Sequence, residues 1–383
     1  MSLSSKGLTR LHDTLARHVD DGTCPGLVAV VRRRGETHVE VIGDVRRDTI
    51  FRITSMTKPV TAALAMVLVE QGVLRLDDRV DELLPELADR RVLTSMRAPL
   101  DDTVPANRPI TLRDLLTFRM GFGAIYAPPG TYPVQAAAAE LKLGLGDGPP
   151  QPAEPPAPDE WLRRFATLPL LCQPGERWIY HVSAEVLGIL LARATGKSLG
   201  EAMREHLFEP LGMIDTGFHV PVEHLGRLPV SYGEDGSVYD PVDGQWSRPP
   251  AFEAGGGGLV STADDYLAFA TMLLRNGKPI LSRPSVRTMT ADHLTPEQHA
   301  RDGFWPGAFE HRGWGFGVSV VTGRDQIWAT PGRYGWDGGL GTSWHNDPAE
   351  ELTALLMTQR SAFPLNSKLY LDFWNGVYSA LDD

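Results

Sequence analysis

Apolar residues follow two different periods along this chain of 383 residues. In GLVAVVRRRGETHVEVIGDV, residues 26–45, they form short runs rich in valine, which predicts two strands joined by a turn at Arg34 and Gly35. A helical period precedes these strands and predicts an amphipathic helix through Leu8, Leu11, Leu15 and Val19. A long apolar helix is predicted after the strands, from near Ser55 to near Gly72.

Helical patterns dominate the middle of the chain and strand patterns return at its end. SAEVLGILLARATG predicts a helix that ends at Gly196, and AGGGGLVSTADDYLAFATMLLRNG predicts a glycine turn followed by another helix. The segments WGFGVSVVT, LGTSWHND and ELTALLMTQ predict strands, and a last helix follows them. We therefore expect an α+β fold: a discontinuous sheet domain from residues 1–75 and 255–383, with an inserted, mainly helical domain at 76–254.

One segment inside the predicted helical region has a different composition. GDGPPQPAEPPAPDE is rich in proline and glycine, which disfavour helices and strands. We expect residues 124–158 to form an extended, irregular flap rather than packed structure.

Composition and charge exclude several classes of protein. Hydrophobic residues make up 42% of the chain, enough for a sizeable core, and the formal net charge of −11 argues against nucleic acid as a partner. No window is apolar enough for a membrane span and no signal peptide is visible, so a cytoplasmic location is expected. Cys24 and Cys172 fit no metal spacing and are expected to be free thiols, although one disulfide is also compatible with the sequence.

Two serines are candidates for a nucleophile. Ser198 lies in GKSLG, which matches G-x-S-x-G, but a helix rather than a strand precedes it. Ser198 and Glu201 also have the spacing of a capping box, so we interpret Ser198 as a helix cap. Ser55 lies in FRITSMTKPV with Lys58 three residues later, which on a helix places the ammonium beside the hydroxyl. Pro59 lacks an N–H and predicts an irregular first turn.

Five ordered segments resemble the serine β-lactamase and penicillin-binding-protein superfamily, and within it the family VIII carboxylesterases and related β-lactamase-like hydrolases. They are IFRITSMTKPVTAALAMVLVEQGVLRLDD, ITLRDLLTFRMGFG, PGERWIYHVSAEVLGILLARATG, AGGGGLVSTADDYLAF and GWDGGLGTSWHNDP. The resemblance covers most of the chain and implies an antiparallel sheet flanked by helices. It also implies a serine hydrolase that forms an acyl-enzyme and takes a small-molecule ester or related acyl substrate.

Site residues follow from the resemblance motif by motif. Ser55 matches the nucleophile, Lys58 its deprotonating partner and Tyr180 the second-motif tyrosine, a general base and acid. The backbone N–H groups of Ser55 and Gly339 match the oxyanion hole, and Trp336 and Gly338 match substrate-binding positions. The resemblance implies no metal and no organic cofactor.

Two departures favour an esterase within this superfamily. Trp336 stands where β-lactamases and peptidases usually have Lys or His, and Val182 stands where the second motif often has Asn. Arg333 lies three residues before Trp336 and is a candidate replacement charge. The alternatives are a β-lactamase or D-alanyl-D-alanine carboxypeptidase, and a non-catalytic binding module on the same fold. Intact Ser55, Lys58 and Tyr180 argue against the binding module.

Overall fold

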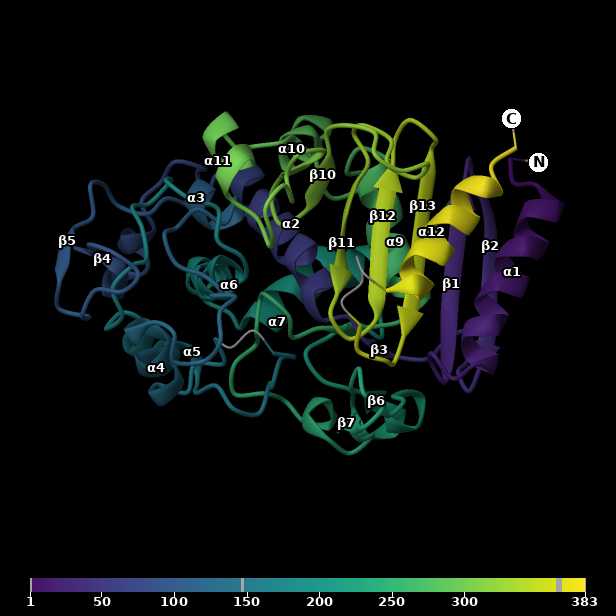
Figure 1. Cartoon of the computed structure of the whole chain (residues 1–383), viewed down its shortest axis with the longest axis horizontal. Helices are drawn as coiled ribbons and strands as arrows, with labels where there is room; N and C mark the ends of the chain where they lie inside the picture. The colour runs from purple at the N-terminus through teal and green to yellow at the C-terminus, as the bar shows by residue number, and fades with distance from the viewer. Residues whose placement is uncertain (1, 146–147, 363–366, 383) are drawn as a thin grey trace.

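The apolar runs from the two ends of the chain form one antiparallel sheet (Figure 1). The computed structural model describes residues 2–145, 148–362 and 367–382. Within these ranges seven strands lie in the order β2-β1-β13-β12-β11-β10-β9. Their bounds are β1 Gly26–Arg33, β2 Glu36–Gly43, β9 Arg312–Trp314, β10 Ser319–Val321, β11 Tyr334–Gly338, β12 Thr342–Asp347 and β13 Leu352–Thr358.

Helices cover both faces of this sheet and make up much of the region beside it. Helices α1 and α12 lie side by side over one face, and α2 and α9 lie over the other (Figure 1). The bounds are α1 Ser5–Asp20, α2 Thr57–Glu70, α3 Leu112–Leu116, α4 Pro133–Glu140, α5 Pro158–Phe165, α6 Val182–Thr195, α7 Leu199–Met203, α8 Glu209–Leu211, α9 Ala263–Leu274, α10 Arg283–Met289, α11 Pro296–Arg301 and α12 Lys368–Ser379.

Short strands and turns complete the chain. The two-stranded pairs are β3 Phe51–Arg52 with β8 Val260–Ser261, β4 Arg91–Leu93 with β5 Thr103–Pro105, and β6 Ser231–Tyr232 with β7 Val238–Asp240. Single turns of 3-10 or π helix are η1 Thr54–Met56, η2 Val80–Glu82, η3 Pro85–Leu87, η4 Arg204–Phe208, η5 Val222–Arg227 and η6 Gln245–Ser247.

The central strands are buried on both faces. On β1, Val28 and Val30 pack in the core shared with α2 and α9, whereas Leu27, Ala29 and Val31 pack against α1 and α12. Successive side chains of a strand point to opposite faces, so both sets of positions must be apolar when helices cover both faces. This explains why the strand sequences are continuous apolar runs rather than alternating ones.

The segment 124–158, apart from residues 146–147, which lie outside the described part of the chain, is more ordered than its composition predicts. It contains α4, whose Val134 is fully buried, and Leu143 is also buried. The Leu143 carbonyl accepts a hydrogen bond of 2.9 Å from the indole of Trp161. The run VQAAAAE has high helix propensity and supplies an apolar anchor, and these local features outweigh the prolines that flank it.

Both cysteines are free thiols, as expected from their spacing. Burial raises the pKa of Cys24 to about 11 and that of Cys172 to about 12, so both thiols stay protonated near neutral pH. Neither is therefore a candidate for a reactive thiolate.

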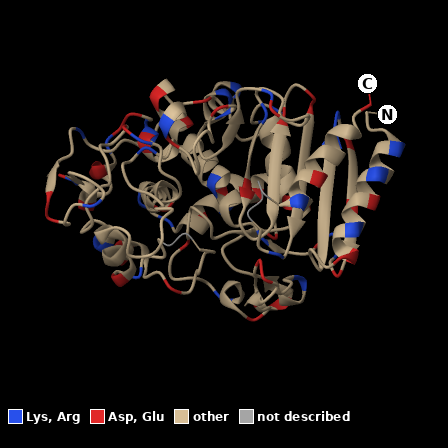
Figure 2. Cartoon of the chain, in the orientation of Figure 1, with Lys and Arg blue, Asp and Glu red and all other residues tan. Residues whose placement is uncertain are grey.

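Charged residues of both signs are interspersed along the chain in the view of Figure 2. In the described part of the chain, no helix is both long and apolar enough to cross a membrane.

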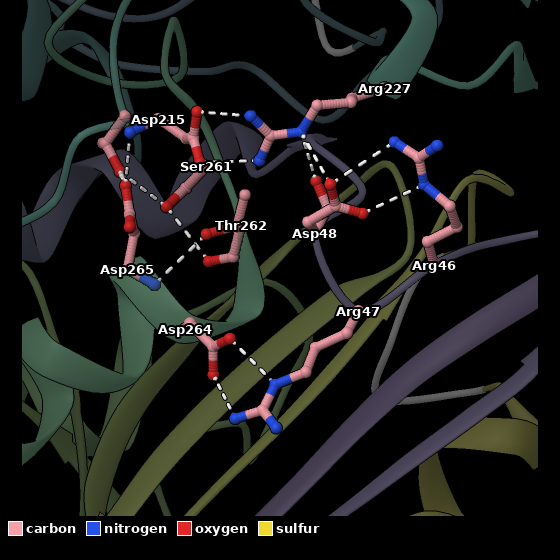
Figure 3. A network of polar contacts seen from close by, with 10 residues as sticks. Arg46, Arg47, Asp48, Asp215, Arg227, Ser261, Thr262, Asp264 and Asp265 are labelled. Atoms are coloured by element: carbon pink, nitrogen blue, oxygen red, sulfur yellow. Dashed lines mark hydrogen bonds and ion pairs between the residues drawn. The ribbon is translucent and has the colours of Figure 1, made fainter.

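Ion pairs and hydrogen bonds fix the segment that leads into β3 (Figure 3). Arg227, at the end of η5, makes two bonds of 2.6 and 2.7 Å to Asp215 and lies 3.3 Å from Asp48. Arg47 pairs with Asp264 on α9 at 2.9 and 3.0 Å. Asp265, also on α9, accepts a bond of 2.8 Å from the backbone N–H of Asp215. The network joins the approach to β3 to η5 and α9, and so positions the turn that follows β3.

Candidate active site

Ser55 lies in the turn between β3 and α2. This turn is the 3-10 segment η1, in which the N–H of Met56 donates to the Ile53 carbonyl at 3.0 Å, and the α-helix begins only at Thr57. The irregular start agrees with the prediction from Pro59. Thr54 has a φ of 41°, a left-handed conformation that is unusual for a β-branched residue. Ser55 is thus presented from a tight turn rather than from a regular helix.

Neighbouring strands hold this turn closely. The N–H of Ile53 donates to the Leu259 carbonyl at 3.1 Å, and the N–H of Leu259 donates to the Thr57 hydroxyl at 3.1 Å. A Cβ atom on Gly338 would stand 2.4 Å from the Ile53 carbonyl oxygen, so only glycine lets the end of β11 approach the turn. Gly338 is buried and does not line the cavity described below; its position indicates close packing of β11 rather than contact with a substrate.

Lys58 is buried beside Ser55. Its Nζ atom lies 2.9 Å from the Ser55 Oγ atom and donates to the Gly256 carbonyl at 2.5 Å. Burial lowers the pKa of Lys58 to about 7, although the nearby Glu185 carboxylate acts to raise it. A neutral amine is therefore accessible near pH 7, which a surface lysine does not offer.

Tyr180, two residues before the start of α6, also lies beside Lys58. The Lys58 Nζ atom lies 4.6 Å from the centre of the Tyr180 ring. The Tyr180 hydroxyl accepts a hydrogen bond of 2.7 Å from the indole N–H of Trp336. Burial raises the pKa of Tyr180 well above its usual range, so the phenol keeps its proton and is able to donate it. The structure therefore brings together Ser55, Lys58, Tyr180 and Trp336.

Trp336 on β11 is part of an aromatic wall. Its ring stacks on Phe304 at 6.0 Å between centroids and meets Trp314 edge-on at 4.7 Å. Tyr180 also packs against Phe304, at 4.9 Å. The wall presents apolar ring faces to a ligand, because the indole N–H of Trp336 is already bonded to the Tyr180 hydroxyl.

The candidate replacement charge does not reach this wall. Arg333 is fully buried, and its guanidinium lies over the rings of Trp328 at 4.9 Å and Trp374 at 4.1 Å. Trp374 is on α12, on the far face of the sheet. Val182, the other departure, is buried in the core at the start of α6. Neither position supplies a polar group for a substrate.

A cavity of about 400 Å³ opens onto Ser55. Its walls come from the turn at Ser55, from the flap and from the strand β11, and include Thr54, Ala124, Tyr126, Pro149, Pro150, Tyr180, His181, Gly256, Gly257, Phe304, Trp336 and Gly339. Of the described residues that line it, none is a lysine or an arginine, whereas Glu234 and Asp337 are acidic. The cavity therefore suits a neutral ligand better than a carboxylate.

Gly339 follows β11 and lies at the cavity wall with Ser55. A Cβ atom there would meet no atom within 4 Å, so the backbone is open to the cavity. The Gly339 carbonyl accepts a bond of 3.0 Å from the Ser361 hydroxyl, which orients the peptide between Gly339 and Leu340. The two backbone groups predicted for an oxyanion hole thus border one cavity.

A second cavity, of about 550 Å³, lies between the sheet and α12. It shares Glu234, Ser361 and Ala362 with the first cavity but is not lined by Ser55, Lys58 or Tyr180. The first cavity, although smaller, is the one lined by Ser55 and Tyr180.

Two residues near Lys58 were not predicted from the sequence. Glu185 on α6 has a buried carboxylate, and burial raises its pKa to about 7. His181, which lines the cavity, has a φ of 82° and a pKa that burial lowers well below its usual range, so it is neutral. An acidic residue within the apolar run SAEVLGILL was the available signal for Glu185.

Ser198 is a helix cap, as predicted. Its hydroxyl accepts from the Glu201 N–H at 3.2 Å, and the Glu201 side chain accepts from the Ser198 N–H at 2.9 Å. Among the residues that the structure describes, no group of three or more His, Cys, Asp or Glu side chains could hold a metal ion.

Known proteins resemble this chain in sequence and in fold. The family described as Beta-lactamase matches residues 11–371. The chain belongs to the Beta-lactamase family. Protein Rv1367c of Mycobacterium tuberculosis is 38% identical over 367 residues, which cover 89% of this chain and 87% of the relative. Esterase EstB of Burkholderia gladioli is 31% identical over 386 residues, which cover 92% and 91%.

A solved structure has the same fold. EstCE1, described as a hydrolase with promiscuous acyltransferase activity, aligns with a TM-score of 0.79 at 23% identity and covers 97% of this chain and 98% of its own. The predicted β-lactamase/transpeptidase-like fold is therefore confirmed. As a member of the Beta-lactamase family with esterase relatives, the protein is a serine hydrolase.

Proposed function

We propose that the protein hydrolyses neutral carboxylic esters through an acyl-enzyme on Ser55. The observation that carries the proposal is the 2.9 Å contact between the Lys58 Nζ and Ser55 Oγ atoms beside a cavity lined by no lysine or arginine among the described residues. A buried amine in contact with a serine hydroxyl is suited to activate it as a nucleophile.

In the proposed acylation, neutral Lys58 takes the proton of Ser55 as the Oγ atom attacks the ester carbonyl. Collapse of the tetrahedral intermediate breaks the bond to the alcohol, which leaves with a proton from the Tyr180 hydroxyl. The proton on Lys58 then restores Tyr180. In the second half, water attacks the acyl-enzyme and gives its proton to the same pair, which returns it to the Ser55 Oγ atom as the bond to the acyl group breaks and the acid leaves. The N–H groups of Ser55 and Gly339 are proposed to bind the oxyanion in both halves.

Acyl transfer to an alcohol is a second candidate outcome of the same acyl-enzyme. It is supported by the apolar cavity walls, which favour an alcohol over water, and by the acyltransferase activity in the description of EstCE1. A β-lactamase or peptidase is less well supported, because their substrates carry a carboxylate and the cavity offers no described cation to pair with it. A binding module has no need of a buried lysine beside a serine.

The test combines covalent labelling with turnover. A fluorophosphonate should label the peptide that contains Ser55, and a short-chain p-nitrophenyl ester should be hydrolysed far faster than a chromogenic cephalosporin. Ser55→Ala should abolish both the label and the turnover. Ser198→Ala is the matched control: it should keep kcat and lose about 1 kcal/mol of stability, as a lost helix cap does. Labelling at Ser198, or efficient cephalosporin hydrolysis, contradicts the proposal.

A further inference from the structure

Glu185 is a buried carboxylate in the first turn of α6, among apolar neighbours. Its Oε1 atom lies 3.4 Å from the His181 Nε2 atom, and the N–H groups of Gly255 and Gly256 face the carboxylate. No described residue gives its Oε2 atom a hydrogen bond. A carboxylate is costly to bury in this way without a cation, so its presence calls for a partner.

Lys58 is the cation whose charge acts on Glu185. One glycine, Gly256, lies against both side chains. The Gly256 carbonyl accepts the 2.5 Å hydrogen bond from the Lys58 Nζ atom. A Cβ atom on the same glycine would stand 2.5 Å from the Glu185 Oε1 atom. Glycine at this position therefore lets α2 and α6 place an ammonium and a carboxylate against a single residue.

We propose that Glu185 is a positioning residue for Lys58, which sets the pH at which Lys58 is able to take the Ser55 proton. Glu185 touches no reacting atom: the proton moves from the Ser55 Oγ atom to the Lys58 Nζ atom and later restores the Tyr180 hydroxyl, which protonates the leaving alcohol. The carboxylate instead supplies the counter-charge for the ammonium that forms when Lys58 accepts the Ser55 proton. This inference rests on the proposed function, because it concerns the base of that reaction.

The charges around the pair support this assignment. The Glu185 carboxylate raises the pKa of Lys58, and the Lys58 ammonium lowers the pKa of Glu185, so the two groups titrate together. His181 is the other titratable group in contact with Glu185, and it is neutral because burial lowers its pKa. Tyr180 faces Lys58 through its ring and keeps its proton. A proton is therefore shared within the pair, so neutral Lys58 is reached without exposing a lone buried charge.

The first test is the pH dependence of ester hydrolysis. The ionised carboxylate raises the pKa of Lys58, so Glu185→Gln should move the acidic limb of kcat/KM to lower pH, by about 1 unit or more. Glu185→Asp keeps the charge and should leave the limb near its wild-type position with a lower kcat. Glu201→Gln, which removes a carboxylate from the neighbouring helix α7, is the control and should not move the limb. A limb that stays in place in a folded Glu185→Gln variant overturns the inference.

A second test requires neither ester hydrolysis nor a folded Glu185→Gln variant. Infrared titration of the wild-type protein should show a protonated carboxyl band that disappears with a midpoint near pH 7. Lys58→Met removes the cation that lowers the pKa of Glu185, so the midpoint should rise in that variant. A wild-type protein with no such band overturns the inference even if Glu185→Gln does not fold. Failure of the wild type to hydrolyse any ester would instead overturn the proposed function, and the infrared result would still decide whether Lys58 and Glu185 are coupled.

Discussion

At the residue scale, the candidate nucleophile and the candidate acid each adjoin a residue with left-handed backbone. Thr54, before Ser55, has a φ of 41°, and His181, after Tyr180, has a φ of 82°. Such conformations cost about 1–3 kcal/mol each for residues other than glycine and persist only where surrounding contacts enforce them. The hydrogen bonds and close packing around Ile53 supply that enforcement for Ser55. The two hydroxyl groups are thus held by strain that the rest of the fold offsets.

The buried lysine predicts a specific pH dependence. Lys58 has a pKa lowered to about 7 and acts as a base only when neutral, so kcat/KM for a neutral ester should rise as the pH increases through about 7 and then level off. Lys58→Met should lower kcat/KM by roughly 10²-fold or more and remove this limb. Lys197→Met changes an exposed lysine and should leave the profile unaltered. A wild-type profile flat from about pH 6 to about pH 8 would rule out Lys58 as the base.

The indole N–H of Trp336 predicts a smaller effect. Trp336→Phe keeps the stacking on Phe304 but removes the 2.7 Å hydrogen bond to the Tyr180 hydroxyl. One neutral hydrogen bond contributes about 0.5–1.5 kcal/mol, so kcat for a p-nitrophenyl ester should fall about 3- to 10-fold, with KM nearly unchanged. Trp305→Phe alters a partly exposed ring at 6.0 Å from Phe304 and serves as the control. Unchanged kcat in Trp336→Phe would show that this bond does not act in the reaction.

Local spacing revealed some of these residues and could not reveal others. Ser55 and Lys58 are three residues apart, so the geometry of one helical turn predicts their contact. Glu185 reaches the site through α6, and no short-range pattern records where a distant element will pack. Closeness in sequence also misled for Arg333, whose place near Trp336 suggested a substrate-binding cation. Successive strand residues point to opposite faces of a sheet. Arg333 accordingly stacks on Trp374, on the other face from the cavity.

At the element scale, the site forms where the first turns of α2 and α6 meet the end of β11. The elements with long apolar runs, such as β1, β13 and α6, were predicted from sequence with bounds close to those observed. Residues 124–158 were not, because overall composition was given more weight than the short helix-forming run in α4. Strands of two or three residues, such as β3 and β8, carry too few positions for a period to be visible. Their pairing is set by tertiary contacts around the site.

The flap predicts an effect on acyl-chain preference. Pro150 lines the cavity. Its carbonyl accepts a hydrogen bond from the hydroxyl of Tyr239, which lies in β7. Tyr239→Phe removes this bond and should loosen the wall, raising KM for a long-chain p-nitrophenyl ester about 2- to 5-fold, as loss of one hydrogen bond does. The acetyl ester is the internal control, because its short chain does not reach the flap. Equal changes for both esters would show that Pro150 does not contact the acyl chain.

At the scale of the whole molecule, the excess of acidic residues acts on substrates before they bind. The formal net charge is −11, and the cavity itself is lined by two acidic residues and, in the described part of the chain, by no lysine or arginine. A field of this sign repels anions over about 10 Å at an ionic strength of about 0.1 M and farther in dilute salt. The net charge of the protein and the lining of the candidate site therefore both disfavour substrates that carry a carboxylate.

This field predicts a salt effect that depends on substrate charge. For an ester with a free carboxylate, kcat/KM should increase as ionic strength rises from about 0.01 to about 0.15 M, because screening shortens the range of repulsion. For the matching neutral methyl ester, kcat/KM should stay constant within about twofold. A neutral substrate that responds as strongly as the anionic one would show that salt acts on the protein rather than on the encounter.

The pairing of β1 with β13 also determines when the site can be completed during synthesis. Val30 lies opposite Leu355, so every residue from β1 to β13 must leave the ribosome before these two strands pair. Until then, the hairpin of β1 and β2 exposes apolar side chains on both faces and an unpaired edge, a combination that favours aggregation. Ser55 and Lys58 emerge early, but β11, which packs against their turn, emerges late. A nascent chain therefore carries its candidate nucleophile long before the candidate site is complete, and we expect its yield in cells to fall when that first hairpin is left unprotected.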